Sequence, residues 1–140
     1  MSEFCKKYQC MPLFFKKERD SDFYNSCEDI RRAYGGEYIS TSEIARLAVR
    51  SQAKSFYLSY CRCYNIIRLI KNEEKLSSRS KAKTALYEEI KRRYLQIKEE
   101  KPALKDSDIV CIIIKEEAPR FYITDVSAEI LYYKLLKTMK

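Results

Sequence analysis

Three polar side chains recur at every third position in the segment YCRCYNIIRLIK, residues 60–71: Arg62, Asn65 and Arg68. On an α-helix these positions lie along one face, and the apolar residues of the segment fall on the other. Arginine and asparagine are the side chains that form paired hydrogen bonds with guanine and adenine in the DNA major groove. The pattern therefore predicts a helix that contacts DNA. It also fits an ordinary solvated helix face, and both interpretations stay open.

Further basic residues lie on both sides of this segment. Residues 41–71 carry six Lys or Arg against one Glu, and the whole chain has a net charge of +8. Basic side chains hold phosphates without reading base sequence. Glutamates share residues 80–100 with the basic run there, so ion pairs within a helix are an alternative explanation of that run. The predicted phosphate contacts are Arg46, Arg50, Lys54, Lys71, Lys91, Arg92 and Arg93.

Several classes of chemistry are disfavoured by composition. The chain has no histidine, which is the usual general base near neutral pH and the usual partner of a cysteine nucleophile. Its two glycines cannot form a phosphate-binding loop of the known glycine-rich kinds. Its six cysteines lack the C-x2-C spacing of zinc sites. We therefore expect no enzymatic activity, no cofactor, no metal and no small-molecule substrate.

The same scarcity of glycine predicts the fold class. A chain of 140 residues with two glycines and three prolines has few of the residues on which tight turns depend. We expect an all-α protein with a single domain of five or six helices. Residues 20–140 form this domain, and residues 1–19 form a loosely packed N-terminal arm. A helix before the two glycines is expected to stop at Gly35 or Gly36.

An internal repeat organises the predicted helices. The stretch AKSFYLS at residues 53–59 recurs as APRFYIT at residues 118–124, and the match extends without a gap over residues 43–70 and 108–135. We predict two similar helix-turn-helix-like hairpins joined by a long amphipathic helix over residues 80–100. Their outline resembles a helix-turn-helix motif, but twelve residues separate Ala45 from Leu58, more than the compact motif has.

Each repeated stretch is predicted to be the corner of a hairpin. A small residue starts the break, an aromatic pair fills it, and a hydroxyl side chain caps the next helix. The phenylalanines are expected inside and the tyrosines at the rim. Ser40 is expected to cap the first helix of the first hairpin, and Asp106 or Ser107 that of the second. The predicted corner residues are Ala53, Phe56, Tyr57, Ser59, Ala118, Phe121, Tyr122 and Thr124.

The two repeated segments differ at the positions predicted to contact DNA. The positions that match Arg62, Asn65 and Arg68 are Ser127, Ile130 and Tyr133. The first segment is therefore the predicted DNA contact, whereas Ile130 and Tyr133 form a predicted interaction face for a second copy of the chain or for another protein. The alternative function is a helical protein-interaction or structural module that binds no nucleic acid.

The sequence also bears on location. The longest purely apolar run, residues 112–114, is far shorter than a membrane span. The N-terminal residues are polar and charged, unlike a signal peptide. Cysteines of a protein that is not exported are expected to stay reduced. We expect a cytoplasmic protein that does not interact with a membrane.

Overall fold

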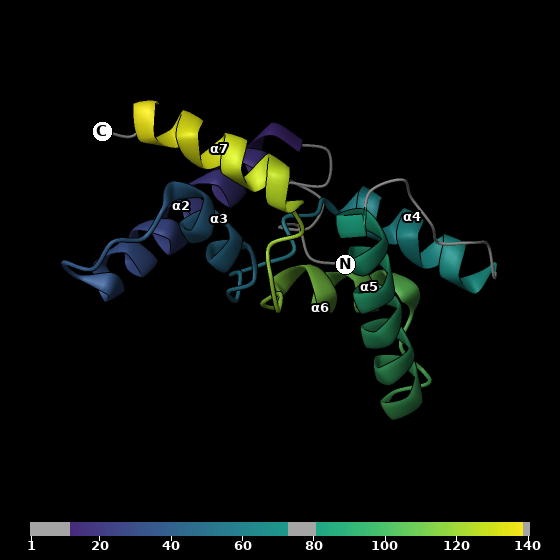
Figure 1. The fold of residues 1–140 in the computed structure, drawn as a ribbon. Helices are drawn as coiled ribbons and strands as arrows, with labels where there is room; N and C mark the ends of the chain where they lie inside the picture. The colour runs from purple at the N-terminus through teal and green to yellow at the C-terminus, as the bar shows by residue number, and fades with distance from the viewer. Residues whose placement is uncertain (1–11, 73–80, 139–140) are drawn as a thin grey trace.

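The computed structural model describes residues 12–72 and 81–138 (Figure 1). Over these residues the chain is a single all-α domain with six helices and no strand, so the predicted fold class is confirmed. The prediction for residues 1–11 of the arm lies outside the described residues, and residues 12–19 belong to the first helix. The helices are α2 (Pro12–Tyr34), α3 (Thr41–Val49), α4 (Tyr60–Lys71), α5 (Lys81–Glu100), α6 (Asp106–Lys115) and α7 (Asp125–Thr138).

Local side chains fix several helix ends. The hydroxyl oxygens of Ser40, Ser59 and Thr124 each accept a hydrogen bond from the amide three residues later, at 3.1, 3.2 and 3.2 Å. These bonds satisfy amides in the first turns of α3, α4 and α7, which have no partner within the helix. At the end of α2, Gly35 takes a left-handed φ of 58°, a conformation that glycine adopts without strain.

The start of α6 differs from the prediction. Its N-cap is Lys105, which makes no side-chain cap bond, and Asp106 is already the first helical residue. The prediction that Asp106 or Ser107 would cap this helix is wrong. The physical reason is that the Asp106 carboxylate binds other helices, through Lys71 at 2.7 Å and Tyr94 at 3.0 Å.

The six helices pack as two groups of three. Helices α2, α3 and α7 contact one another, and helices α4, α5 and α6 contact one another. Figure 1 shows the yellow α7 beside α2 and α3, while α4 lies with α5 and α6. Helices α3 and α4 follow each other in the chain but belong to different groups, as do α6 and α7. The predicted hairpins, in which the two helices of one segment would pack together, are therefore not confirmed.

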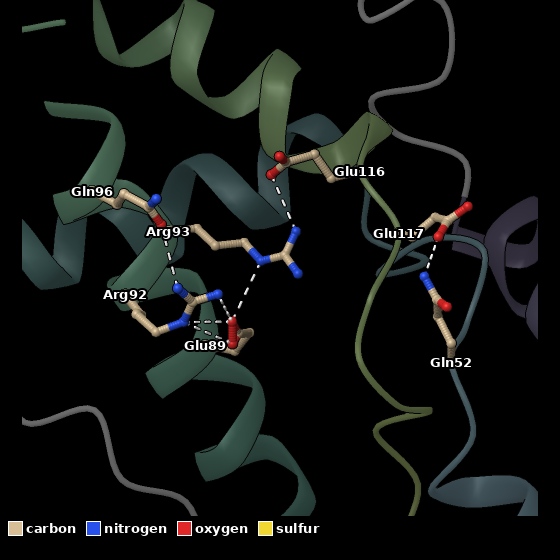
Figure 2. A network of polar contacts seen from close by, with 7 residues as sticks. All are labelled: Gln52, Glu89, Arg92, Arg93, Gln96, Glu116 and Glu117. Atoms are coloured by element: carbon tan, nitrogen blue, oxygen red, sulfur yellow. Dashed lines mark hydrogen bonds and ion pairs between the residues drawn. The ribbon is translucent and has the colours of Figure 1, made fainter. Parts of the chain in front are cut away.

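Two extended segments carry the chain between the groups, and they meet at two alanines. The Ala53 amide donates to the Ala118 carbonyl at 2.9 Å, and the Ala118 amide donates back to the Ala53 carbonyl at 3.0 Å. Both alanines are buried, so their backbone groups have no access to water and need these partners. Beside them the Gln52 amide donates to the Glu117 carboxylate, and Figure 2 shows this pair apart from the contacts around Arg93.

Aromatic rings surround this meeting point. Phe56 stacks on Tyr122 and Tyr57 stacks on Phe121, each with ring centroids 6.0 Å apart. Phe23 of α2 meets Phe121 edge-on at 5.6 Å. Phe56 and Phe121 are buried, whereas the two tyrosines are half-buried. These residues belong to the one buried cluster that includes side chains of both helix groups.

Tyr57 occupies an unusual backbone position. Its φ of 56° is left-handed, and it is the one non-glycine residue with a positive φ in the described part of the chain. Such a conformation costs about 1–3 kcal/mol and persists only where surrounding contacts enforce it. Here the Tyr57 hydroxyl donates to Asp22 of α2 at 2.7 Å. Burial and this carboxylate raise the pKa of the hydroxyl, so it stays protonated as a donor.

Phe121 is the ring whose removal should damage the fold most directly. Phe121→Ala is expected to lower the free energy of unfolding by about 3–5 kcal/mol, because a buried ring that contacts both Phe23 and Tyr57 leaves a cavity. Urea unfolding followed by circular dichroism measures this loss. The matched control is Leu95→Ala, since Leu95 is 51% exposed and its truncation should change stability by less than about 0.5 kcal/mol. Equal losses in the two variants would contradict this account of the core.

Candidate nucleic-acid interface

Helix α4 has one apolar face in the core and one polar face toward solvent. The predicted DNA-contacting residues Arg62, Asn65 and Arg68 are all exposed. From Arg62 to Arg68 they span about 9 Å along the helix axis, at 1.5 Å per residue. The helix contains no Asp or Glu, so nothing within it offsets the two arginines. The buried face consists of Cys63, Ile66, Ile67 and Ile70.

The two arginines of this face have no carboxylate partner in the part of the chain that the structure describes. Arg62 donates a long hydrogen bond to the hydroxyl of Tyr87, at 3.4 Å. Neither Arg62 nor Arg68 forms an ion pair with a carboxylate among residues 12–72 and 81–138. A phosphate or a base edge could therefore bind these guanidiniums without displacing an acidic partner among these residues.

The arginines of α3 are in a different situation. Arg46 pairs with Glu129 of α7 at 3.0 Å, and Arg50 pairs with Asp125 of α7 at 3.2 Å. All four groups are at the surface, where an ion pair contributes about 0–1 kcal/mol. The pairs cross from α3 to α7 and help to align the two helices. A phosphate would have to compete with these carboxylates for the same guanidiniums.

The arginines in the basic run of α5 also have carboxylate partners. Arg92 pairs with Glu89 at 2.6 Å, while Arg93 contacts Glu89 at 3.4 Å and Glu116, the C-cap of α6, at 3.2 Å (Figure 2). The Arg93 guanidinium also lies 4.8 Å from the centre of the Phe56 ring. Burial alone would raise the pKa of Glu89, but the hydrogen bond and charge of Arg92 outweigh it and lower that pKa. This cluster stabilises the structure and leaves little charge for a ligand.

The three lysines predicted to contact phosphates differ in their ion pairing and exposure. Lys71 is held by Asp106 at 2.7 Å, and Lys54 lies 4.0 Å from Asp22 with 80% of its side chain exposed. Lys91 is exposed and has no ion pair with a described residue. Of the seven predicted phosphate contacts, Arg46, Arg50, Lys71, Arg92 and Arg93 have carboxylate partners within 3.5 Å.

Some relevant residues were not predicted. Asn72, the exposed C-cap of α4, lies near Asn65 around the helix axis, because seven residues make almost two full turns. On α7, the predicted face of Ile130 and Tyr133 is 58% and 53% exposed, and Val126 extends it with 67% exposure. The spacing i, i+4, i+7 between these three was a signal that the sequence already contained.

The comparisons leave the function to be inferred from this geometry. No protein-family model, curated protein or solved structure matches the chain. Among the described residues, no helix is long and apolar enough to cross a membrane. In the same residues, no three Cys, Asp or Glu side chains gather where they could hold a metal ion.

Asp106 joins the three helices that position the α4 face. It accepts from Lys71 of α4 and Tyr94 of α5, and Lys98 of α5 lies 3.9 Å away. Burial alone would raise the pKa of this carboxyl, but the hydrogen bonds from Lys71 and Tyr94 and the lysine charges outweigh it and lower that pKa. Because the folded pKa is depressed, the stabilisation is complete above the ordinary aspartate value and is lost as pH falls through the folded value.

Asp106→Asn should therefore destabilise the protein in a pH-dependent way. We expect a loss of about 1–2 kcal/mol at pH 7, because the largely buried Asp106 side chain loses the charge that strengthens its hydrogen bonds from Lys71 and Tyr94. The difference from the unaltered protein should shrink as pH falls below the ordinary aspartate pKa of 3.8. Urea unfolding across this pH range measures it. Asp29→Asn is the control, since Asp29 and Arg32 form a highly exposed pair. A pH-independent difference would argue against the charge of Asp106 as the cause.

Proposed function

We propose that the exposed face of α4 binds DNA, with Arg62, Asn65 and Arg68 directed into the major groove. The observation that supports this is the pair of exposed arginines, which have no carboxylate partner among the described residues and lie on a helix without an acidic residue. The major groove admits an α-helix, and arginine and asparagine suit guanine and adenine edges. The apolar opposite face packs in the core, which holds the helix rigidly for such a contact.

The proposed interface contains fewer residues than the one predicted from the sequence. The basic residues with carboxylate partners contribute to stability first, since a phosphate would have to replace an existing ion pair. Few phosphate contacts then remain near α4. The DNA affinity should fall as the salt concentration rises, and the fall becomes steeper with each phosphate that the protein neutralises. A regulatory role in the cytoplasm, without a catalytic step, is part of the proposal.

We further propose that residues 43–70 and 108–135 are two copies of one unit that exchange their second helices. Ala53 and Ala118 hold matching positions in the repeat, and they are hydrogen-bonded to each other. The ring pairs Phe56–Tyr122 and Tyr57–Phe121 correspond in the same way. The first helix of each segment packs on the second helix of the other. Helices α4 and α7 would then be counterparts with different outer faces.

A second candidate function is favoured by the outer face of α7. Val126, Ile130 and Tyr133 expose apolar surface along one line of this helix. Exposed apolar side chains that form a contiguous patch mark interaction surfaces. We propose that this face pairs with the same face of a second copy of the chain. Three side chains bury far less area than a stable dimer requires, so the association should be weak.

The DNA proposal is tested by two matched double variants. Arg62→Ala with Arg68→Ala should weaken binding to duplex DNA by about tenfold or more, because each guanidinium contact with a base contributes about 1–3 kcal/mol. Arg46→Ala with Arg50→Ala removes the same charge from α3 and should change the affinity much less. Fluorescence anisotropy with labelled duplexes at several salt concentrations measures both. Equal losses in the two variants, or no binding by the unaltered protein at low salt, would reject the proposal.

The self-association proposal is tested by changing the α7 face alone. Ile130→Glu with Tyr133→Glu should abolish any concentration-dependent dimer, because two such faces would then bring like charges together. Sedimentation velocity over a range of concentrations detects the change. Leu95→Glu is the control, since Leu95 is similarly exposed on α5. An unaltered protein that stays monomeric at the highest concentration would count against this function.

A further inference from the structure

A cavity of about 380 Å³ lies beside the start of α7 and is unusually basic. Among the described residues, four cationic side chains from three helices line it and no carboxylate does. One of the four, Arg19, also pairs with Asp20 at 2.9 Å. We call this site the basic cavity. Three of its lining residues also line a neighbouring hollow, which adds three cations and the carboxylate of Asp125. The cations of the basic cavity are Lys16 and Arg19 of α2, Lys83 of α5 and Lys134 of α7.

Two helix N-termini meet at this place. Thr124, the N-cap of α7, lines the cavity, and so do Ala82 and Lys83 from the first turn of α5. A helix N-terminus carries partial positive charge and is stabilised by nearby anions. The first turn of α5 contains no acidic residue and has Lys81 and Lys83 instead. Cations thus lie beside helix ends that carry partial positive charge, an arrangement that favours a bound anion.

The rest of the lining indicates what kind of anion fits. Ile123, Ile130 and Leu131 supply apolar surface, and Tyr122 supplies a ring. Hydroxyls of Thr124 and other lining residues can hydrogen-bond to phosphate oxygens. The volume lies within the range of small-molecule sites, about 300–1,000 Å³. We propose that the basic cavity binds a small phosphate ester that carries an apolar or aromatic group.

A small ester suits the site better than the backbone of a nucleic acid does. Nucleic-acid phosphates are held by basic surfaces, often together with polar side chains. The basic cavity is instead an open hollow that is partly apolar, so an organic group can lie against its apolar side chains next to the phosphate. The proposal is independent of the α4 face, because none of Arg62, Asn65 and Arg68 lines the cavity.

Adenosine monophosphate is a suitable probe, with inorganic phosphate for comparison. Isothermal titration calorimetry on the full chain should show that the ester binds and that it binds more tightly than phosphate alone. Lys16→Ala with Lys134→Ala should weaken ester binding by about tenfold or more, since two charge-assisted contacts are lost. Lys17→Ala with Lys137→Ala is the matched control, because these exposed lysines lie outside the lining. The control should weaken binding less than about twofold.

Two further measurements separate this site from the proposed DNA interface. Arg62→Ala with Arg68→Ala should leave ester binding unchanged. Duplex DNA should not displace the ester. The proposal is overturned if the ester fails to bind, if it binds no better than phosphate, or if both lysine double variants lose affinity equally. It is also overturned if duplex DNA displaces the ester and the Lys16/Lys134 variant loses DNA affinity to the same extent.

Discussion

The reciprocal hydrogen bonds between Ala53 and Ala118 are the interaction on which the arrangement of helices depends. Each alanine belongs to an extended segment that passes through the interior, where unpaired backbone groups would be costly. Neither segment can satisfy those groups by itself, so each needs the other in place. The two ring stacks also need both segments, because each stack pairs a ring from one segment with a ring from the other. Neither helix group can therefore form fully without the segment that leads to the other, and the two groups should unfold together.

Local features of this fold were predictable, and the long-range packing was not. The cap residues Ser59 and Thr124, the stop at Gly35 and the buried stripe of α4 all follow from interactions within a few residues. A hydrophobic stripe shows which face of a helix is buried but not which helix covers it. Two hairpins and two exchanged helices bury the same stripes, so the sequence pattern fits both. The contacts that distinguish them are those of α3 with α7 and of α4 with α6.

In the candidate site, too, local features were predictable from the sequence and contacts between distant residues were not. The exposure of Arg62 and Arg68 followed from their spacing on α4. The ion pair of Arg46 with Glu129 could not be predicted, because its partners are 83 residues apart. Net charge counts both kinds of arginine equally, although only a guanidinium without a carboxylate partner attracts a ligand at little cost. Which cations bind ligands therefore depends on the tertiary structure, even where their exposure is evident from the sequence.

Helix α7 connects two of the proposed sites physically. Ile130 lies on its exposed apolar face and also lines the basic cavity, four residues before the cationic Lys134. A ligand in the cavity would contact Ile130 and so change the surface that a second copy of the chain meets. A ligand shifts an association equilibrium only by its difference in affinity for the two states. Ester binding should thus strengthen or weaken self-association through α7, and self-association should alter ester affinity by the same factor. The α4 face lies in the other group of helices and contributes no residue to the cavity, so no shared side chain links DNA binding to the ester.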